Sequence, residues 1–266
     1  MRAAATSDIH YDLLEYYEDH DELKRLIESL MAEKPDILVI AGDTVGLGEA
    51  KLEECLALFE AVTPERMMVF GNHEYWSADL NTFKELKMLE TRIENCGFHL
   101  LDSDPKTIGS VGFVGNCAWY DYSFASKAPP LGSSYEKKLF NEQIVWNDAL
   151  FVKLGKNDRE YSDELIERLE SDIARIENSV DTIVAVTHHA GFKEAVIQKE
   201  NNPEWNFTNA FMGSTRLGEM LRRHPKVKYH IYGHTHRKAQ VEKEHLVSIN
   251  PGSTYQKKKY IVFEVS

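Results

Sequence analysis

Short apolar runs mark the strands that we expect in the first part of the chain. Residues 36–41 are apolar after a leading aspartate, which is typical of a strand buried on both faces of a sheet. Residues 66–70 predict the next strand, and residues 2–6 predict a shorter and weaker one. The segments between these runs follow a different hydrophobic period.

Apolar residues at helical spacing predict helices between the strands. The first helix is expected to have Asp21 as its N-cap and to bury one face. That face consists of Leu23, Leu26, Ile27 and Leu30. Further helices are expected near residues 50–61, with Cys55 on the buried face, and over residues 82–93. Alternating strands and helices favour βαβ units and parallel strand pairing.

The middle of the chain is less regular. Residues 111–116 predict a strand, and residues 117–132 predict a loop that is rich in aromatic residues and contains two adjacent prolines. Residues 134–150 predict a weakly patterned helix, and residues 163–176 predict a helix with a clear apolar face. We interpret residues 117–160 as an irregular insert within a single domain that spans residues 1–266.

Regular patterns return in the last third of the chain. A loop over residues 200–213 is expected to lead into a helix capped by Ser214. Strands are predicted over residues 182–186, 227–232, 246–249 and 260–265. The lysines at 257–259 are expected to form a solvated strand edge. A closing run with more strand than helix indicates two sheets flanked by helices.

Composition restricts the class of protein and its partners. Hydrophobic residues make up 42% of the 266 positions, an ordinary value for a globular chain. There are 43 acidic against 31 basic residues, and a formal charge of −12 repels polyanions, so we expect no nucleic-acid partner and no membrane binding. No apolar run reaches the roughly 18 residues of a membrane-spanning helix, and no signal peptide is evident. We expect a cytoplasmic protein and leave its oligomeric state open.

Polar clusters follow five of the predicted strands directly. They are Asp8-Ile9-His10, Gly42-Asp43, Gly71-Asn72-His73-Glu74, Thr187-His188-His189 and Gly233-His234-Thr235-His236. Ligands of open α/β sheets collect at the carboxyl ends of strands, so these clusters are expected to converge. Carboxylate, imidazole and amide groups suit Mn, Fe and Zn. The three cysteines are too few and too scattered for a zinc ribbon or a disulfide framework.

The order of these clusters resembles that of the calcineurin-like metallophosphoesterase family. The family pattern runs D-x-H, GD, GNH followed by D or E, H, and GHxH. This chain reads SDIH, AGD, GNHE, THH and GHTH in the same order, from Asp8 to His236, and residues 250–253 resemble a later turn of many members. The resemblance implies an α/β fold, a four-layer α/β/β/α sandwich, and an enzyme that hydrolyses phosphate esters with two divalent metal ions.

The resemblance also implies a role for each matched residue. The first metal is implied to be held by Asp8, His10 and His236, and the second by Asn72, His188 and His234. Asp43 is implied to bridge both metals. His73 is implied to act as an acid or an electrostatic stabiliser, oriented by Glu74. A bridging hydroxide is then expected to attack phosphorus in line while His73 protonates the leaving alkoxide.

Plainer interpretations exist for single residues. Asp8 or Asp43 alone can end a strand, and Asn72 alone can form a turn. His189 competes with His188 for the second site, and the family's usual choice of the first histidine favours His188. The remaining histidines fit no motif and are interpreted as surface or core residues; they are His20, His99, His224, His230 and His245.

Two segments have open interpretations. The rings of Trp119, Tyr120, Tyr122 and Phe124 either pack the insert against the domain, which we favour, or form a platform for the substrate. Residues 200–213 either line the mouth of the site or form a surface loop. Specificity is expected to depend on such segments, so the sequence does not name the substrate.

The sequence therefore predicts a dinuclear-metal hydrolase of a small phosphomonoester or phosphodiester, with Mn, Fe or Zn as its metal and a small phosphorylated compound as its substrate. A nuclease of the same superfamily is one alternative, and a basic groove would indicate it. A catalytically silent scaffold subunit is another, and such a protein is expected to have lost ligands. None of the matched positions is missing here.

Overall fold

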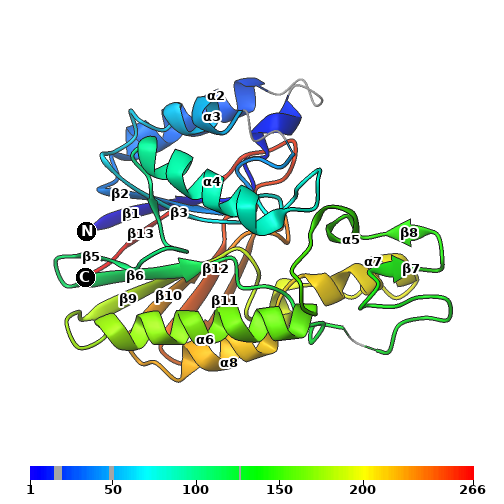
Figure 1. The fold of residues 1–266 in the computed structure, drawn as a ribbon. Coiled ribbons are helices and arrows are strands. Elements are labelled where there is room, and N and C mark those ends of the chain that lie inside the picture. The colour runs from blue at the N-terminus through cyan, green and yellow to red at the C-terminus, as the bar shows by residue number, and fades with distance from the viewer. Residues whose placement is uncertain (15–19, 48–50, 126) are drawn as a thin grey trace.

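The computed structural model describes residues 1–14, 20–47, 51–125 and 127–266, and Figure 1 shows two sheets lying face to face. The strands of the first sheet are β1 (Arg2–Thr6), β2 (Ile37–Ala41), β3 (Glu65–Val69), β4 (His99–Leu100) and β13 (Tyr260–Glu264). Their order is β13-β1-β2-β3-β4, in which β1 to β4 pair in parallel and β13 pairs antiparallel to β1.

The second sheet is also parallel at its centre. Its strands are β5 (Lys106–Ile108), β6 (Val111–Asn116), β9 (Thr182–Thr187), β10 (Val227–Ile231), β11 (Ala239–Lys243) and β12 (Leu246–Asn250). They follow the order β11-β12-β10-β9-β6-β5, and only the edge strands β5 and β11 pair antiparallel. In each sheet the carboxyl ends of the central, parallel strands therefore lie along one edge, where the loops that lead to the helices gather.

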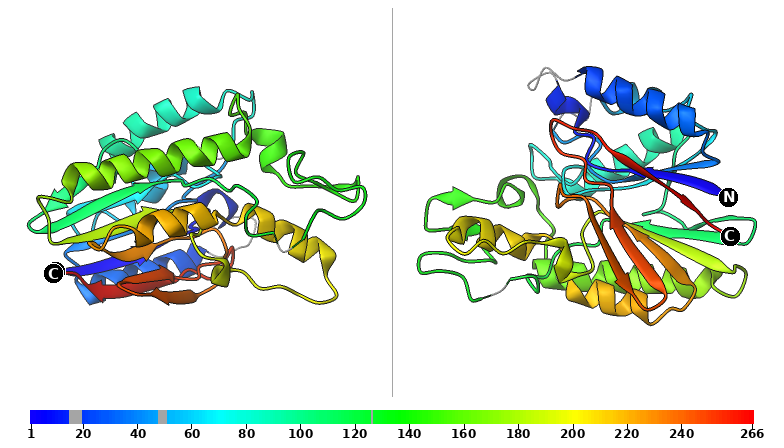
Figure 2. Two further views of the ribbon diagram at one scale, coloured as in Figure 1. Left: turned by 90° about the horizontal axis from the view of Figure 1, so that it is seen from below. Right: turned by 180° about the vertical axis from the view of Figure 1, so that it is seen from behind.

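Helices cover the outer face of each sheet. The first sheet is covered by α2 (His20–Glu33), α3 (Leu52–Ala57) and α4 (Thr82–Asn95), and the second by α6 (Asp158–Ile176) and α8 (Thr215–Arg222). The arrangement has four layers, α/β/β/α, as the resemblance implied (Figures 1 and 2). None of the helices within the described residues has the length and apolar character needed to cross a membrane.

Alternation along the strands supplies three apolar layers. In β2 the side chain of Val39 belongs to the cluster between the sheets, while Leu38 and Ile40 belong to the cluster under the helices. On the second sheet, Ala185 packs with Leu169 of α6 in the third cluster. Strands with both faces covered need apolar residues at every position, which is why β2 is a continuous apolar run.

Most of the predicted elements are present, with shifted bounds. The helix predicted from Asp21 begins at His20, so Asp21 lies in its first turn and is not the cap. The α3 helix is shorter than the predicted 50–61 helix, part of which lies outside the described residues. Cys55 is buried in it, as expected. Three short strands, β4, β5 and β11, were not predicted. The first two have only two and three residues, and β11 has five residues of which only Ala239 and Val241 are apolar, so each carries little periodic signal.

The connection between β6 and α6, residues 117–157, departs most from the sequence prediction. The helix predicted over residues 134–150 is absent. This part holds the hairpin β7 (Leu139–Phe140) with β8 (Ile144–Val145), and the short helix α5 (Asp148–Phe151). Lys138, Asn141 and Glu142 have φ of +53°, +50° and +57°, which a right-handed helix does not admit. The hairpin projects from the end of the sandwich opposite the termini (Figures 1 and 2).

The predicted loop over residues 200–213 also contains helix. It holds α7 (Pro203–Thr208) and the 3₁₀ turn η4 (Asn209–Phe211), and two further 3₁₀ turns are η1 (Tyr11–Leu13) and η3 (Lys193–Ala195). Asn202 caps α7 by accepting from Trp205 N at 2.9 Å, and Pro203 follows at the first helical position. That Asn-Pro pair was a readable start signal.

Candidate metal centre

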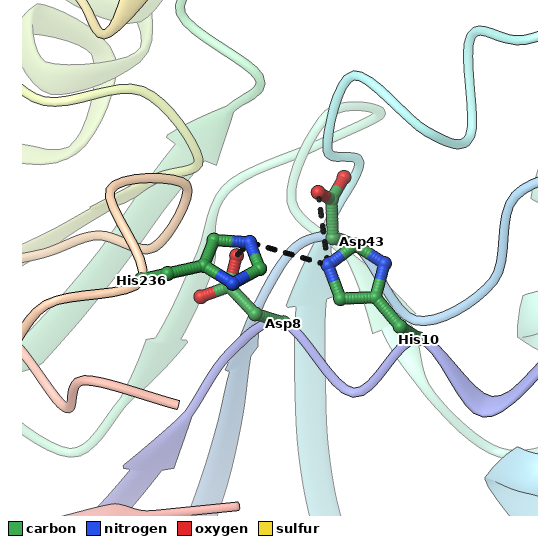
Figure 3. Close-up of side chains that lie close together, drawn as sticks. All are labelled: Asp8, His10, Asp43 and His236. Carbon is green, nitrogen blue, oxygen red and sulfur yellow. Dashed lines mark hydrogen bonds and ion pairs between the residues drawn. The ribbon is translucent and has the colours of Figure 1, made fainter. Parts of the chain in front are cut away.

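The polar clusters of the sequence lie in loops that follow the carboxyl ends of parallel strands. Asp8 and His10 follow β1 and Asp43 follows β2, while His188 follows β9 and His234 follows β10. Because the strands of both sheets run toward the same end of the sandwich, these loops meet there. Figure 3 shows four of the side chains, those of Asp8, His10, Asp43 and His236.

The first group of side chains is Asp8, His10, Asp43 and His236, whose ligand atoms all lie within 4.8 Å of one another (Figure 3). The Nε2 atoms of His10 and His236 are 3.4 Å apart. His236 Nε2 is 3.5 Å from Asp8 Oδ1, and His10 Nε2 is 3.6 Å from Asp43 Oδ2. Burial lowers the pKa of His10 well below its ordinary value, so its ring is neutral and offers a lone pair.

Asp43 belongs to a second group as well, with His188 and His234. His188 Nε2 lies 3.2 Å from Asp43 Oδ2 and 3.1 Å from His234 Nδ1. Asn72 Oδ1 is also 3.1 Å from His188 Nε2. One carboxylate is thus shared by two adjacent groups of ligand atoms.

Main-chain carbonyls set the tautomers of both histidines in the second group. His188 Nδ1 donates to the carbonyl of Ala41 at 2.9 Å, and His234 Nε2 donates to that of Phe211 at 3.1 Å. A carbonyl oxygen only accepts, so the protons are on these outer nitrogens. In the neutral rings the inner nitrogens then carry the lone pairs, and they lie beside the oxygens of Asp43 and Asn72.

This donor set fits a divalent cation. When both rings are neutral, four electron-pair donors meet here, an arrangement that a positive charge, whether a proton or a cation, stabilises. Burial lowers the pKa of His188, but Asp43 and Asp8 outweigh burial and raise it to about 9. A site that draws a proton this strongly is short of positive charge. Nitrogen and oxygen donors of this kind suit Mn, Fe or Zn.

Backbone strain is concentrated at the same residues. Asp8, His10, Asp43, His234 and His236 have φ of 54°, 45°, 53°, 63° and 49°. For a residue other than glycine, this left-handed conformation costs roughly 1–3 kcal/mol and persists only where the surroundings impose it. Part of that support comes from the ligands themselves, because Asp8 Oδ1 accepts from His234 N at 2.9 Å and Asp43 Oδ1 accepts from His73 N at 3.0 Å.

His73 lies beside the shared carboxylate and not among its closest contacts. Its Nε2 is 3.9 Å from Asp43 Oδ2, and its ring stacks on Trp76 with centroids 3.8 Å apart. Both rings line a cavity of about 230 Å³ at the centre. The rest of its lining is Asp43, Asn72, Val145, Trp146, Asn147, His234, His236 and Tyr255.

Glu74 has contacts other than those expected from the sequence. Its carboxylate accepts from the amides of Gly71, Asp43, Thr44 and Val45 at 2.6, 3.0, 2.7 and 3.0 Å. None of the hydrogen bonds among the described residues joins it to the ring of His73. The expectation that Glu74 orients His73 is therefore replaced: Glu74 ties the loop after β2 to the loop after β3. Gly71 is needed there, because a Cβ would lie 2.1 Å from Asp43 Oδ1.

His189 lies outside both groups of ligand atoms. Its Nδ1 is 3.0 Å from the carbonyl of Cys117, and its ring packs against His234 with centroids 4.3 Å apart. Burial lowers the pKa of His189 to about 3. His188 therefore lies among the ligand atoms of the second group, and His189 does not.

Sequence reasoning missed the residues that wall the cavity. Trp146 and Tyr255 come from segments without a motif, and Trp76 follows the GNHE cluster without belonging to it. The rings at 119–124 are buried, as the packing interpretation expected, and do not line this cavity. Lys258, expected at a solvated edge, is 6% exposed and donates to the carbonyl of Asp8 at 3.1 Å.

Comparison with protein families gives one match that covers most of the chain. The sequence model of the family described as calcineurin-like phosphoesterase matches residues 1–238. The matched range includes every polar cluster of the two ligand groups. No curated protein matches the sequence.

Solved structures share the fold at low sequence identity. A phosphopantetheinyl hydrolase from Mycobacterium tuberculosis is 18% identical with a TM-score of 0.70, over 97% of this chain and 95% of that one. A dimetal phosphatase from Danio rerio is 15% identical with a TM-score of 0.57, over 98% of this chain and 91% of that one. At these identities the likeness concerns the fold.

Proposed function

The chain belongs to the calcineurin-like phosphoesterase family, and from that premise we propose that it hydrolyses a small phosphomonoester or phosphodiester with two divalent metal ions. The observation that carries the proposal is the carboxylate of Asp43, which belongs to both groups of ligand atoms. A shared carboxylate can hold two cations about 3.5–4 Å apart. Asp8, His10 and His236 would hold one ion, and Asn72, His188 and His234 the other.

The chemistry divides between the ions and the protein. When bound, a pair of divalent cations supplies a water nucleophile at neutral pH and neutralises charge on the phosphoryl group. His73 lines the cavity with a side chain that is not needed as a ligand. We propose that its Nε2 donates a proton to the leaving alkoxide, or stabilises the charge that develops there. Glu74 holds the loops that carry Asp43 and His73.

The shape of the cavity favours a small substrate. Its volume is about 230 Å³, and its walls include the rings of Trp76, Trp146 and Tyr255. Among the described residues that line it there is no lysine or arginine. A nuclease gathers several phosphate contacts from such residues, so the nuclease alternative has no support from the lining. The complete ligand set likewise disfavours a silent scaffold.

Two substitutions test the roles. Asp43→Asn is expected to lower both metal content and activity, because it weakens ligands of both ions. His73→Ala is expected to lower kcat roughly 10²–10⁴-fold while metal content stays normal. Elemental analysis and hydrolysis of mono- and bis-nitrophenyl phosphate provide the two readouts. A chain that binds fewer than two ions after Mn²⁺ reconstitution would refute the proposal, and loss of metal in His73→Ala would refute the role of His73.

The natural substrate needs a wider screen. The similarity to a phosphopantetheinyl hydrolase makes phosphopantetheinyl esters a reasonable part of it. Nucleotides and sugar phosphates complete a set in which leaving groups differ in size and charge. Turnover that discriminates among these compounds would assign the leaving group, while equal turnover of all would indicate that the cavity walls do not select.

A further inference from the structure

One carboxylate in the β6–α6 connection, that of Asp148, accepts four side-chain hydrogen bonds. Its Oδ1 accepts from Asn72 Nδ2 at 2.9 Å and from Trp76 Nε1 at 2.7 Å. Its Oδ2 accepts from the Tyr120 hydroxyl at 2.9 Å and from Trp146 Nε1 at 2.8 Å. Asp148 is 1% exposed, so these bonds replace its hydration.

The bond from Asn72 decides which way its amide points. A carboxylate oxygen only accepts, so the NH₂ group of Asn72 must face Asp148. The amide oxygen then faces the opposite way, 3.1 Å from His188 Nε2. If the Asn72 amide were turned by half a rotation, its oxygen would face the carboxylate oxygen of Asp148 and repel it. Its NH₂ group would then face His188 and Asp43, and an NH₂ group cannot bind a metal ion.

We propose that Asp148 is a positioning residue for the second metal ion, acting through Asn72. It fixes the amide of Asn72 with its carbonyl oxygen toward His188 and Asp43. The proposal rests on the proposed function, because it presumes that an ion is bound there. Removing a residue that hydrogen-bonds to a metal ligand typically lowers metal affinity 10–100-fold.

The same carboxylate also holds two walls of the cavity. Trp76 and Trp146 both line it, and each donates its indole NH to Asp148. Trp76 in turn stacks on His73. A residue of the connecting segment therefore couples the orientation of a metal ligand to the shape of the substrate cavity.

A neighbouring carboxylate provides a matched control. Asp158 is 5% exposed and also accepts from aromatic side chains, namely from Trp119 Nε1 at 2.7 Å and from the hydroxyl of Tyr122. It pairs with Lys138. None of its hydrogen bonds among the described residues reaches a proposed ligand. Asp158→Asn thus disturbs the same kind of buried network without touching Asn72.

Metal titration tests the proposal without relying on turnover. Metal-free protein is titrated calorimetrically with Mn²⁺, and with Co²⁺ while its visible absorption is followed, so that the two ions are resolved. Asp148→Asn is expected to weaken one ion roughly 10–100-fold and leave the other within about 2-fold. Asp158→Asn is expected to leave both within about 2-fold. Wild-type affinities in Asp148→Asn, or equal losses in both variants, would overturn the proposal.

A double-mutant cycle tests whether Asp148 acts through Asn72. In an Asn72→Ala background, Asp148→Asn is expected to have less than about a 2-fold further effect on the second ion, because its target is gone. Multiplying losses would show that Asp148 acts by another route. If the Asn variant does not fold, Asp148→Glu retains the charge and displaces the oxygens; wild-type affinities in that variant would also overturn the proposal.

The two proposals fail in different ways. A wild-type chain that binds fewer than two ions refutes the proposed function, whatever Asp148 does. A wild-type chain that binds two ions, with Asp148→Asn binding them equally well, refutes the positioning role alone.

Discussion

Single hydrogen bonds decide what each histidine at the centre can do. His188 and His234 each give a ring proton to a main-chain carbonyl, which leaves the other nitrogen free to bind a cation. The neighbouring His189 uses Nδ1 on the carbonyl of Cys117, and its Nε2 is buried with no partner among the described residues. His188 and His189 are adjacent in one loop, but their hydrogen bonds to main-chain carbonyls orient the rings differently, so only His188 presents a ring nitrogen to the centre.

Replacing these two histidines separately is expected to give unequal effects. His188→Ala is expected to weaken binding of the second ion strongly, because it removes a proposed ligand. His189→Ala is expected to be milder for metal binding, because the His189 ring lies outside both groups of ligand atoms and packs against the rings of His188 and His234. Metal content after dialysis against a weak chelator measures both. Equal loss in the two variants, or a larger loss in His189→Ala, would contradict the assignment.

At the scale of elements, a few polar contacts fix where helices begin and how loops are joined. The α6 helix begins at Asp158 because Asn157 and Glu160 form a capping box, with Asn157 Oδ1 accepting from Glu160 N at 2.9 Å. The carboxylate of Asp102 joins the two sheets. It accepts hydrogen bonds from the amide of Phe70, just beyond β3, at 2.9 Å and from the amide of Cys117, just beyond β6, at 3.1 Å.

Removing the α6 cap is expected to lower stability and leave the metal centre intact. Asn157→Ala is expected to cost about 1 kcal/mol, since one amide of the first turn loses its partner. For a chain of this size that corresponds to a fall in Tm of roughly 2–4 °C. Asn178→Ala, at an exposed asparagine beyond the end of the same helix, is the control and is expected to be near neutral. Equal shifts in both variants would mean that the cap contributes nothing.

Asp102 predicts a pH dependence of stability. Burial raises the pKa of Asp102 from 3.8 to about 7. Between these two pH values the folded chain holds a proton that the unfolded chain has released. The contribution of protonated Asp102 to the free energy of unfolding is therefore complete below about pH 4 and is lost as the pH rises to about 7. The difference in unfolding free energy between wild type and Asp102→Asn is expected to fall across that window, by at most about 4 kcal/mol. Urea unfolding of chelated protein at several pH values measures it; a constant difference would show an ordinary pKa.

At the scale of the whole molecule, net charge and the local centre act in opposite directions. The formal charge of −12 repels a long polyanion, with screening beyond about 8–10 Å at ordinary ionic strength. With two cations bound as proposed, a single phosphate group at the centre would experience mainly their charge. The cavity of about 230 Å³ admits a small group of this kind and has no lysine or arginine among its described lining residues.

Activity is therefore expected to depend on substrate size more than on salt. Small phosphate esters are expected to be turned over at a kcat/KM that changes little with ionic strength, while duplex DNA or structured RNA is expected to be a poor substrate. The measurement compares nitrophenyl phosphates, nucleotides and a short labelled oligonucleotide at low and high salt. Efficient and strongly salt-sensitive cleavage of the oligonucleotide would favour a nuclease instead.

The sequence by itself determined the parts of this protein that depend on local pattern. Strands such as β2 and β9 are buried on both faces and read as apolar runs, and the polar clusters directly follow such strands. Parallel pairing then brings the clusters to one edge, so their convergence was predictable without coordinates. The start of α6 at Asp158 is also readable from the capping box of Asn157 and Glu160, five residues before the helix that the apolar face predicts over residues 163–176.

Only the tertiary structure decided the contacts between distant segments. Asp148 meets Asn72 across 76 positions of the chain, and Tyr255 comes to lie against His10 and His236. No periodicity encodes such pairs, because they depend on how a connection without regular pattern packs. The hairpin that replaced the helix predicted over residues 134–150 has the same cause: local propensity is weak there, and tertiary contacts outweigh it.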